Sequence, residues 1–398
     1  MKYDIVVVGA GPAGSVTARF ASERGAKVLM IDRRAEIGIP VLCGEGISQR
    51  IDSWGMLEGT DWIASKMDGA KIYAPDNTLV TLSKEMAGNE TGYVVYRDRF
   101  DKELARQAGK AGSELLLRTN CIGLNKKNGK ITGIKVEQDH ETFDINCDIL
   151  VGADGVESKI GKWAGIKTTL NPYDLETCYQ YTLTNVDYES DYCEFYLGHK
   201  RSPGGYIWSF PKGNGMFNVG IGILASLSKP GKAKQLLEVF IKQHPEYQKG
   251  TPIRVLSGAV PVAKPIETIA DNLLLVGDAA RHADSITGGG LTTSLEGGKI
   301  AGEVIADAIE KQKFDKETLS DYDTRWKRAF GQKLLRNYAV KEIMLDMDDK
   351  TLNMLADSLK DYKFDEFSTL SLIKALVLKH PSLLIKLKPL MKLSEKEA

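Results

Sequence analysis

Three glycine-containing stretches carry the residue types that bind phosphate and ribose groups. They read GAGPAG at Gly9–Gly14, ADG at Ala153–Gly155 and GDAAR at Gly277–Arg281. In the first stretch Gly9 permits a tight turn, Gly11 lets the backbone approach a pyrophosphate, and Gly14 lets a helix pack closely on a strand. The start of that helix supplies free N–H groups and a partial positive charge. One such stretch fits NAD, NADP or FAD, but all three in this order predict a dinucleotide laid across a sheet.

An acidic residue closes the second predicted strand of this region. Asp32 stands where a carboxylate can accept both hydroxyls of an adenosine ribose. Arg33 and Arg34 follow it, and a cation here could bind a 2′-phosphate. With Asp32 present, we interpret both arginines as surface charges.

The later stretches supply the other end of a dinucleotide site. Asp154 lies in the turn after a predicted strand, and Asp278 follows an apolar strand, where it can bind a ribityl hydroxyl. Gly290 then opens a helix that begins near Leu291. Such a helix N-terminus can face the pyrimidine edge of a flavin and stabilise the negative charge of the reduced ring. The predicted cofactor is FAD; the alternative is a flexible loop with an ordinary helix cap.

These residues need a parallel sheet to position them. Residues 5–8 form an all-apolar run, a helix is expected to about Arg24, and a second strand covers 27–31, which makes one βαβ unit. Residues 98–110 predict a helix, and short strands alternate with turns from 114 to 151. Residues 273–276 return to the apolar parallel-strand type.

A second sheet is expected from about 177 to 224, where aromatic residues occur in strand-like runs separated by glycines. Helical patterns dominate from 290 onward. The predicted division is an FAD-binding domain in two parts, 1–165 (with a sheet excursion near 66–96) and 266–335. An antiparallel-sheet substrate domain covers 166–265, and a helical region covers 336–398.

Composition narrows the function classes. The formal net charge is zero, which argues against nucleic acid as a partner. The five cysteines are scattered without a C-x-x-C pair, so we expect reduced thiols, no bound metal and a cytoplasmic protein. The apolar start is interrupted by Asp4 and is interpreted as a first strand rather than a secretion signal. No segment has the ~20 apolar residues that span a bilayer.

The three stretches resemble the flavoprotein family of para-hydroxybenzoate hydroxylase type, which includes aromatic monooxygenases, halogenases and geranylgeranyl reductases. The resemblance covers roughly residues 1 to 335. It implies a Rossmann-type FAD-binding domain interleaved with an antiparallel substrate sheet, in an α/β (α+β) fold. One departure is Ser285, because many members have a proline in that stretch.

Two further segments resemble one branch, the geranylgeranyl reductases, and most closely its archaeal members that act on digeranylgeranylglycerophospholipids. These segments are P-V-L-C-G-E-G at 40–46 and Y-I-W-S-F-P-K-G at 206–213. The resemblance implies FAD-dependent saturation of the isoprenoid chains of ether lipids, with the first segment beside the flavin and the second lining the substrate cavity. The flavin contacts that it implies are Ala13, Asp32, Cys43, Gly44, Gly46, Arg97, Cys121, Asp278, Gly290 and Leu291.

Reduction of an isolated alkene needs a hydride and a proton. No carbonyl is conjugated to the bond, so positive charge builds at the more substituted carbon. Cys43, or a water held by Glu45, is the candidate proton donor, because a thiol is mostly protonated at neutral pH. The alternative for Cys43 is a small residue that leaves the chain room to pass the flavin.

Tyr206, Trp208 and Phe210 alternate with smaller residues and are expected on one face of a strand. There they would line an isoprenoid tunnel and stabilise developing positive charge. The alternative is that they form only the core of the second sheet. Arg336 is a candidate partner for a lipid phosphate, with a surface ion pair as the alternative.

The partners expected are an isoprenoid lipid and an external electron donor, which can be ferredoxin, a deazaflavin or NAD(P)H. Basic amphipathic stripes at 370–377 and 383–387 can place the protein peripherally at the inner face of the cell membrane; the alternative is a helix packed on its own domain. Three other functions stay open: an FAD monooxygenase, a geranylgeranyl reductase that acts on a different isoprenoid, and a lipid carrier that retains FAD without catalysis.

Overall fold

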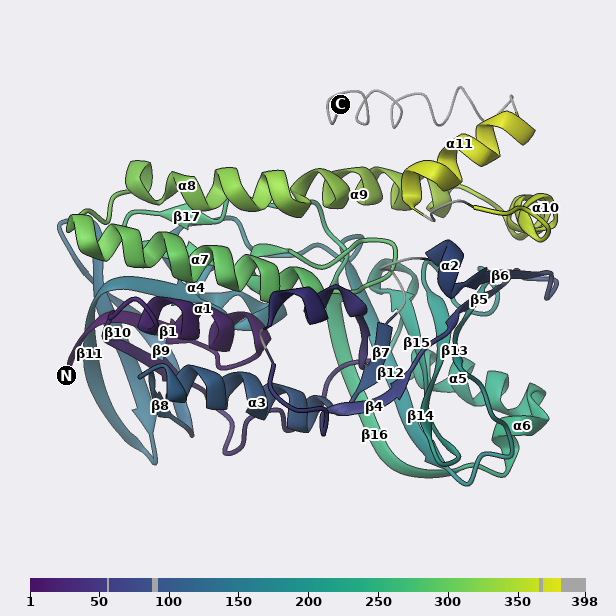
Figure 1. The fold of residues 1–398 in the computed structure, drawn as a ribbon, viewed down its shortest axis with the longest axis horizontal. Coiled ribbons are helices and arrows are strands. Elements are labelled where there is room, and N and C mark those ends of the chain that lie inside the picture. The colour runs from purple at the N-terminus through teal and green to yellow at the C-terminus, as the bar shows by residue number, and fades with distance from the viewer. Residues whose placement is uncertain (56, 88–91, 365–367, 381–398) are drawn as a thin grey trace.

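The computed structural model describes residues 1–55, 57–87, 92–364 and 368–380. The molecule is elongated, with an α/β layer at one end and a large antiparallel sheet at the other (Figure 1). Helices α7 (Leu291–Lys311), α8 (Lys316–Trp326) and α9 (Gln332–Leu345) lie along one side of the α/β layer. The mixed α/β fold class predicted from the sequence is confirmed.

The first sheet has the strand order β17-β18-β11-β1-β2-β8, with β10 and β9 attached beside β11. β1 (Lys2–Val8) lies between β2 (Val28–Ile31) and β11 (Glu141–Gly152), parallel to both. The remaining members are β8 (Glu114–Leu116), β9 (Thr119–Lys127), β10 (Lys130–Gln138), β17 (Ile269–Ala270) and β18 (Leu273–Leu275). Ile5, Val6 and Val7 are fully buried, as the all-apolar run predicts, because helices cover one face of β1 and residues of β9 and β10 pack on the other.

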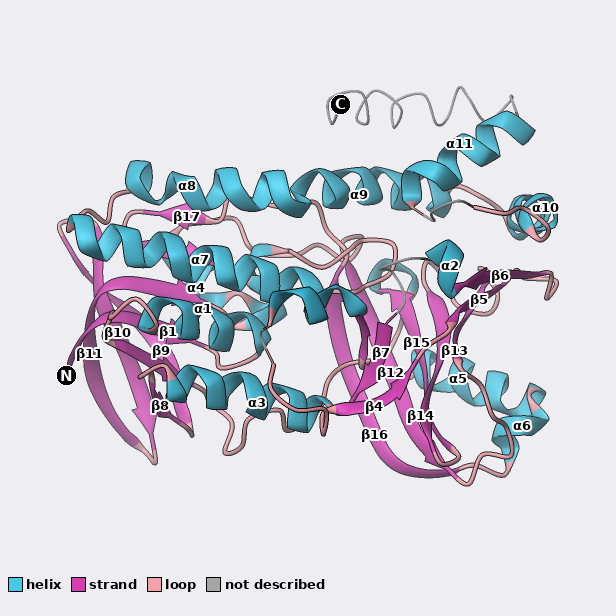
Figure 2. Ribbon diagram, viewed as in Figure 1, coloured by secondary structure: helices cyan, strands magenta, loops and turns pink. Residues whose placement is uncertain are grey.

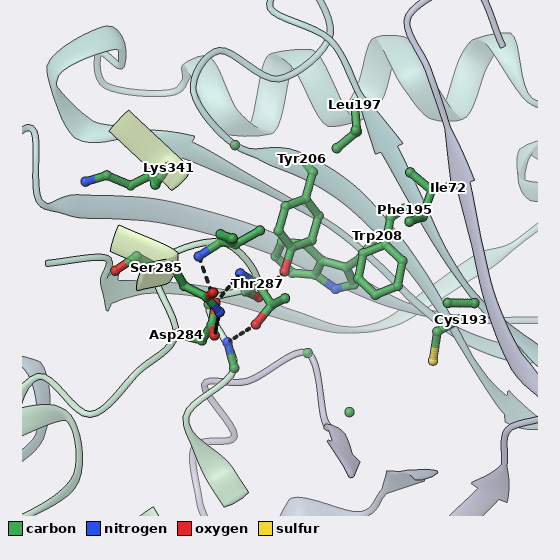
Figure 3. Close-up of a pocket in the computed structure, with 18 of the residues that line it drawn as sticks. Ile72, Cys193, Phe195, Leu197, Tyr206, Trp208, Asp284, Ser285, Thr287 and Lys341 are labelled. Carbon is green, nitrogen blue, oxygen red and sulfur yellow. Dashed lines mark hydrogen bonds between the residues drawn. The ribbon is translucent and has the colours of Figure 1, made fainter. Parts of the chain in front are cut away.

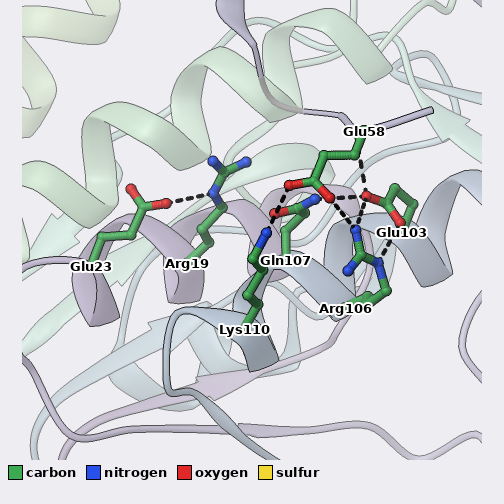
Figure 4. Close-up of polar contacts among 7 residues, drawn as sticks. All are labelled: Arg19, Glu23, Glu58, Glu103, Arg106, Gln107 and Lys110. Atoms are coloured by element: carbon green, nitrogen blue, oxygen red, sulfur yellow. Dashed lines mark hydrogen bonds and ion pairs between the residues drawn. The ribbon is translucent and has the colours of Figure 1, made fainter.

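The helix that follows β1 is α1 (Pro12–Ser22), slightly shorter than expected. It packs between α7 and α3 (Arg97–Lys110). Phe100, Leu104 and Ala108 form the buried face of α3. The outer faces of α1 and α3 carry exposed ion pairs such as Arg19–Glu23, and Glu58 joins Arg106 and Lys110 (Figure 4). Such exposed pairs contribute little to stability, which comes from the buried face.

The second sheet has the order β16-β12-β15-β14-β13-β5-β6. Its strands are β5 (Gly69–Tyr73), β6 (Leu79–Ser83), β12 (Leu175–Thr184), β13 (Tyr192–Leu197), β14 (Tyr206–Gly213), β15 (Met216–Leu224) and β16 (Thr251–Pro261). All neighbours are antiparallel except β13 and β5. One face is covered by α5 (Lys232–Gln243) and α6 (Pro245–Gln248), and the other faces the α/β layer and the C-terminal helices (Figure 2).

Smaller elements connect the two sheets. β3 (Gly46–Ser48), β7 (Gly92–Val95) and β4 (Ile63–Lys66) form a three-stranded sheet, and β4 and β7 contact β14. The other helices are α2 (Lys84–Ala87), α4 (Lys159–Ala164), α10 (Asp349–Leu359) and α11 (Thr369–Lys379). The domain boundaries inferred from the sequence stay predictions.

Along α11, Ile373 and Leu376 are buried against residues of α10 and β6. The apolar stripe at 370–377 therefore packs largely on the protein itself. The second stripe, at 383–387, lies outside the described residues. Within the part of the chain that the structure describes, no helix is both long enough and apolar enough to cross a membrane.

Candidate active site

The three glycine-containing stretches meet at the carboxyl ends of β1, β11 and β18. Gly9 has φ +105°, and a side-chain carbon built on it would lie 2.2 Å from the carbonyl oxygen of Ala153. A carbon built on Gly14 would lie 1.9 Å from the Gly9 oxygen. The backbone of α1 therefore packs directly on the backbone of the turn, with no room for a side chain. No atom lies within 4 Å of the same position on Gly11, which leaves the turn open where a pyrophosphate would approach.

Asp32 lies at the end of β2 with 5% of its side chain exposed. Its carboxylate accepts the Ala10 N–H at 3.0 Å and two guanidinium N–H groups of Arg34 at 2.7 and 2.8 Å. Burial opposes ionisation, but the hydrogen bonds and charge of Arg34 outweigh it and hold the pKa of Asp32 below its ordinary value. The interpretation of Arg34 as a surface charge was therefore wrong, whereas Arg33 is exposed and pairs with Glu157.

The third stretch packs on the first through small residues. A carbon built on Gly277 would lie 2.8 Å from the Ala13 side chain, and one built on Gly290 would lie 3.1 Å from a carboxylate oxygen of Asp278. Asp278 therefore faces the N-terminus of α7, where Gly290 is the cap residue and Leu291 the first helical residue. Burial raises the pKa of Asp278, and the charge of Arg97 acts against this shift.

Asp154 lies against the turn at Gly9, and Cys121 lies near Asp154. One Asp154 oxygen accepts the Ile160 N–H at 3.0 Å, and the other is buried without a hydrogen-bond partner among the described residues. Cys121 is buried on β9, two residues beyond Thr119, whose N–H donates to the Asp32 carbonyl at 2.9 Å. Burial raises the pKa of Cys121 to about 11, so its thiol is neutral.

These features fit FAD. An open phosphate turn, a carboxylate at the ribose position, a buried carboxylate oxygen without a partner and a glycine-capped helix N-terminus are the donors and acceptors that a flavin dinucleotide would engage. The individual contact residues stay predictions.

The loop before β3 holds a fully buried carboxylate. Glu45 has φ +74°, a left-handed conformation that is unusual for a residue other than glycine. Its oxygens accept the Arg97 N–H at 2.9 Å, the Asn218 amide at 2.6 Å and the Lys212 ammonium. Burial lowers the pKa of Lys212, and the Glu45 charge acts against this shift. Because protein donors occupy both oxygens, Glu45 holds the loop in place more readily than it holds a water.

Cys43 lies two residues before this anchor, and its sulfur accepts the Glu45 N–H at 3.2 Å. The Arg97 guanidinium binds Asp101 through two hydrogen bonds, at 2.7 and 2.9 Å. Burial opposes its charge, but Asp101 and the Cys43 sulfur outweigh burial and raise the pKa of Arg97. The thiol therefore lies beside a permanent cation at the edge of the predicted flavin site.

The loop and β14 pack against each other. Carbons built on Gly44 and Gly46 would lie 3.2 and 3.3 Å from the Phe210 ring. Trp208 donates its indole N–H to Gln180 at 2.7 Å, and Gln180 lies 3.4 Å from the Cys43 carbonyl oxygen. A carbon on Gly220 would lie 2.3 Å from the Trp208 ring, so that glycine makes room for the indole on the sheet.

The aromatic residues of β14 line a cavity of about 760 Å³. It extends from the Cys43–Gly46 loop and Gly288–Leu291, across the second sheet, to α9, α10 and α11. Tyr206, Trp208 and Phe195 lie together on one side of it, and Lys341, Asp284 and Ser285 lie on another (Figure 3). Most other lining residues are apolar, among them Ile72, Leu82, Leu197, Val260, Leu355 and Leu376. Tyr206, Trp208 and Phe210 are thus both sheet core and cavity wall.

Arg336 lies on α9 and lines the same cavity with 8% of its surface exposed. Arg336 is therefore not an exposed surface residue, and its contact with a lipid phosphate stays a prediction. Sequence reasoning assigned no role to four residues of the site: Gln180, Lys212, Asn218 and Asp101. Lys212 lay inside the segment already singled out, but its partner Glu45 is far away in the sequence, and only the fold brings the two together.

Comparison with known proteins places the chain in a family. The model of the geranylgeranyl reductase catalytic domain matches residues 174–260, and that of the pyridine nucleotide-disulphide oxidoreductases matches 3–189. The chain is 42% identical to the digeranylgeranylglycerophospholipid reductase of Methanothrix thermoacetophila, over 98% of this chain and 100% of that protein. The chain belongs to the digeranylgeranylglycerophospholipid reductase family. A second member, from Picrophilus torridus, is 41% identical over 98% of this chain and 99% of its own.

Solved structures agree with this assignment to the digeranylgeranylglycerophospholipid reductase family. A geranylgeranyl bacteriochlorophyll reductase-like protein from Thermoplasma acidophilum has a TM-score of 0.93 at 40% identity, covering 98% of this chain and 99% of that one. A flavin-dependent brominase has a TM-score of 0.72 at 17% identity, covering 96% and 99%, and supports the fold alone. The resemblance inferred from the sequence, the FAD cofactor and the oxidoreductase class are confirmed.

Proposed function

We propose that this protein is an FAD-dependent reductase that saturates isolated C=C bonds of geranylgeranyl chains on glycerol ether phospholipids. The observation that carries this proposal is the long apolar cavity that runs from the Cys43–Gly46 loop to the C-terminal helices. An isoprenoid chain has no polar group near its double bonds, so shape and apolar contact must position it. The names of the relatives, which are reductases of such lipids, support the same substrate class.

FAD, once bound and reduced, supplies a hydride. The chain's own residues must bind the lipid, exclude water and deliver a proton to the other carbon of the double bond. Phe195, Trp208 and Phe210 form an aromatic group whose π faces favour positive charge at the reacting carbons.

Cys43 is the proton donor in this proposal. Its thiol is part of the cavity wall and lies beside Gly44, whose lack of a side chain lets Phe210 approach. The cation of Arg97 stabilises the thiolate that remains once the proton has left, and solvent then returns the proton. Glu45 positions this loop through Lys212 and Asn218.

A reductase of an isoprenoid lipid requires a lipid and a reductant. The proposed electron donor is ferredoxin, a deazaflavin or NAD(P)H, and the proposed location is the cytoplasm with peripheral contact at the inner face of the cell membrane. Co-flotation with vesicles containing anionic lipid at low salt tests the membrane contact. Recovery of all the protein in the lipid-free fraction would contradict the proposed membrane contact.

The competing function is an FAD monooxygenase on the same fold. The enzyme is photoreduced without oxygen, and digeranylgeranylglyceryl phosphate is then added. A reductase reoxidises its flavin at the expense of the alkene. A flavin that stays reduced until oxygen is admitted, and then yields a hydroxylated lipid, supports the monooxygenase.

A further inference from the structure

One end of the cavity carries a buried carboxyl group that the proposed chemistry does not use. Glu176 lies on β12 with 7% of its surface exposed and lines the cavity. Among the described residues, none donates a hydrogen bond to its carboxyl group, and Lys341 is the charged group that acts on it. A buried carboxyl group without a partner costs free energy, so its presence in an otherwise apolar wall calls for a ligand.

The sheet is shaped around this side chain. A carbon built on Gly222 would lie 2.6 Å from one Glu176 oxygen, and one built on Gly205 would lie 3.3 Å from the other. The carboxyl group therefore lies over bare backbone of β15 and of the turn before β14. A side chain on Gly222 or Gly205 would crowd the carboxyl group in this position. The sheet therefore accommodates Glu176 with its side chain turned toward the cavity.

A second buried polar atom without a partner lines the same region of the cavity. Asn337, on α9, is 3% exposed, and its amide N–H₂ donates to Asp284. Its side-chain oxygen is buried and has no hydrogen-bond partner within the described ranges. Lys341 lies one helical turn further along α9, so Asn337 and the cation that acts on Glu176 share one helix face. Glu176 and Asn337 thus face the cavity from two different elements.

An isoprenoid tail has no hydrogen-bond donor or acceptor for Glu176 or Asn337. The other end of a glycerolipid carries ether, hydroxyl and phosphate oxygens. We propose that Glu176 and Asn337 form a polar subsite that binds the oxygen-bearing end of the isoprenoid lipid. This inference rests on the proposed function and names the part of the substrate that this region of the cavity recognises.

Two observations support the subsite. Burial raises the pKa of Glu176 to about 7, with Lys341 acting against it, so near neutral pH the carboxyl group is partly protonated and can donate to an ether or phosphate oxygen. Asn337 supplies the complementary acceptor for a hydroxyl group. Glu176 and Gln180, which contacts the Cys43 loop, are four residues apart on one strand, or about 13 Å. The subsite is therefore separated from the proposed reacting bond by part of a prenyl chain.

The test compares binding of two probes to the FAD-loaded protein, followed through the change in flavin absorbance. The probes are digeranylgeranylglyceryl phosphate and a geranylgeranyl hydrocarbon that ends in a methyl group. The expected result for Glu176→Leu is at least about tenfold weaker binding of the glyceryl phosphate, with little change for the hydrocarbon. Glu176→Gln, which keeps a donor and an acceptor, should restore most of the affinity.

The matched control is Glu194→Gln on β13 of the same sheet. Glu194 is 2% exposed but faces the opposite side of the sheet, where Tyr188 and Tyr196 donate to it. This variant should bind both probes as the unmodified protein does. Equal weakening for both probes in Glu176→Leu, or no weakening, overturns the subsite.

Turnover separates the remaining outcomes. Unchanged binding with a large loss of turnover on both probes in both Glu176 variants, and loss of a pH-rate limb near neutrality, would make Glu176 a proton donor instead and overturn the subsite. Failure of the unmodified protein to reduce either probe, although it binds the glyceryl phosphate with the expected discrimination, would contradict the proposed reaction and leave the subsite standing.

Discussion

At the residue scale, the site combines the thiol that is proposed to donate the proton with a buried ionic anchor. Cys43 carries the chemistry that is proposed, whereas Glu45 and Lys212 are almost fully buried and fix the loop that presents the thiol. Arg97 connects the two, because its N–H binds Glu45 and its guanidinium lies beside the Cys43 sulfur. Single substitutions at these positions should therefore show which residues affect the rate of alkene reduction and which affect the stability of the fold.

Replacement of Cys43 by serine should leave FAD bound and lower alkene reduction by about 10²-fold or more, since an alcohol is a far weaker acid than a thiol. The rate at which lipid reoxidises the reduced flavin under argon measures this effect. Cys147→Ala is the control, because Cys147 is buried in the first sheet and is not part of the cavity wall. Full alkene-reducing turnover in Cys43→Ser would remove the thiol from the mechanism.

Replacement of Lys212 by methionine should destabilise the fold by about 3–5 kcal/mol, because the Glu45 carboxylate is left buried without its cation. Denaturant unfolding monitored by fluorescence measures the loss. The double variant Lys212→Met with Glu45→Gln should recover a large part of it. No recovery in the double variant would mean that Lys212 acts through packing rather than through the ion pair.

Glu176 predicts a pH dependence of stability. Burial raises its pKa from 4.5 to about 7, so the folded state binds more protons than the unfolded state between these values, and stability falls as pH rises through this window. Lys341, Tyr206 and Cys178 face the carboxyl group and remain in place in Glu176→Gln. The glutamine variant should gain stability relative to the unmodified protein, from near zero at pH 4 to about 3 kcal/mol at pH 8. A difference that does not change between these pH values contradicts the burial of an ionisable group here.

At the element scale, glycines on β15 decide where the cavity wall lies. Gly220 and Gly222 leave space on the sheet for Trp208 and Glu176, which are contributed by the strands on either side.

The strand pattern of aromatic residues could be predicted from the sequence, and so could the glycine turns, because both depend on local spacing. The contacts of Glu45 with Lys212 and Asn218 were not, because they join residues 167 and 173 positions apart. Arg34 was interpreted wrongly for a related reason. Its partner Asp32 is only two positions away, but the folding of the Arg34 side chain back onto it depends on the surrounding burial.

Gly220→Ala should displace the Trp208 ring, since the new methyl group would lie 2.3 Å from it. We expect a loss of about 1–3 kcal/mol in stability and a raised KM for lipid, with FAD retained. Gly123→Ala on β9 is the matched control, because nothing lies within 4 Å of its added carbon. Thermal unfolding and lipid titration distinguish the two, and an unchanged KM in Gly220→Ala would argue that Trp208 does not shape the lipid site.

At the scale of the whole molecule, the predicted FAD site and the proposed lipid cavity lie beside one loop, at Cys43–Gly46. The glycine motifs predict the first, but they leave the reaction open, because the same fold occurs in a flavin-dependent brominase and in a hydroxylase. The cavity is specified by β14, β15 and the C-terminal helices. Its extension beneath α10 and α11 was not predictable from sequence, because the apolar stripe of α11 is equally compatible with a membrane surface until the packing of Ile373 and Leu376 is known.

The central claim is that this cavity and its flavin reduce isolated double bonds. The most direct measurement is mass spectrometry of digeranylgeranylglyceryl phosphate after incubation, without oxygen, with the FAD-loaded protein reduced by dithionite. We expect lipid products that are heavier by two hydrogen atoms for each reduced bond, formed by the unmodified protein and strongly diminished in Cys43→Ser. A lipid of unchanged mass, or one that gains oxygen only when air is admitted, would contradict it.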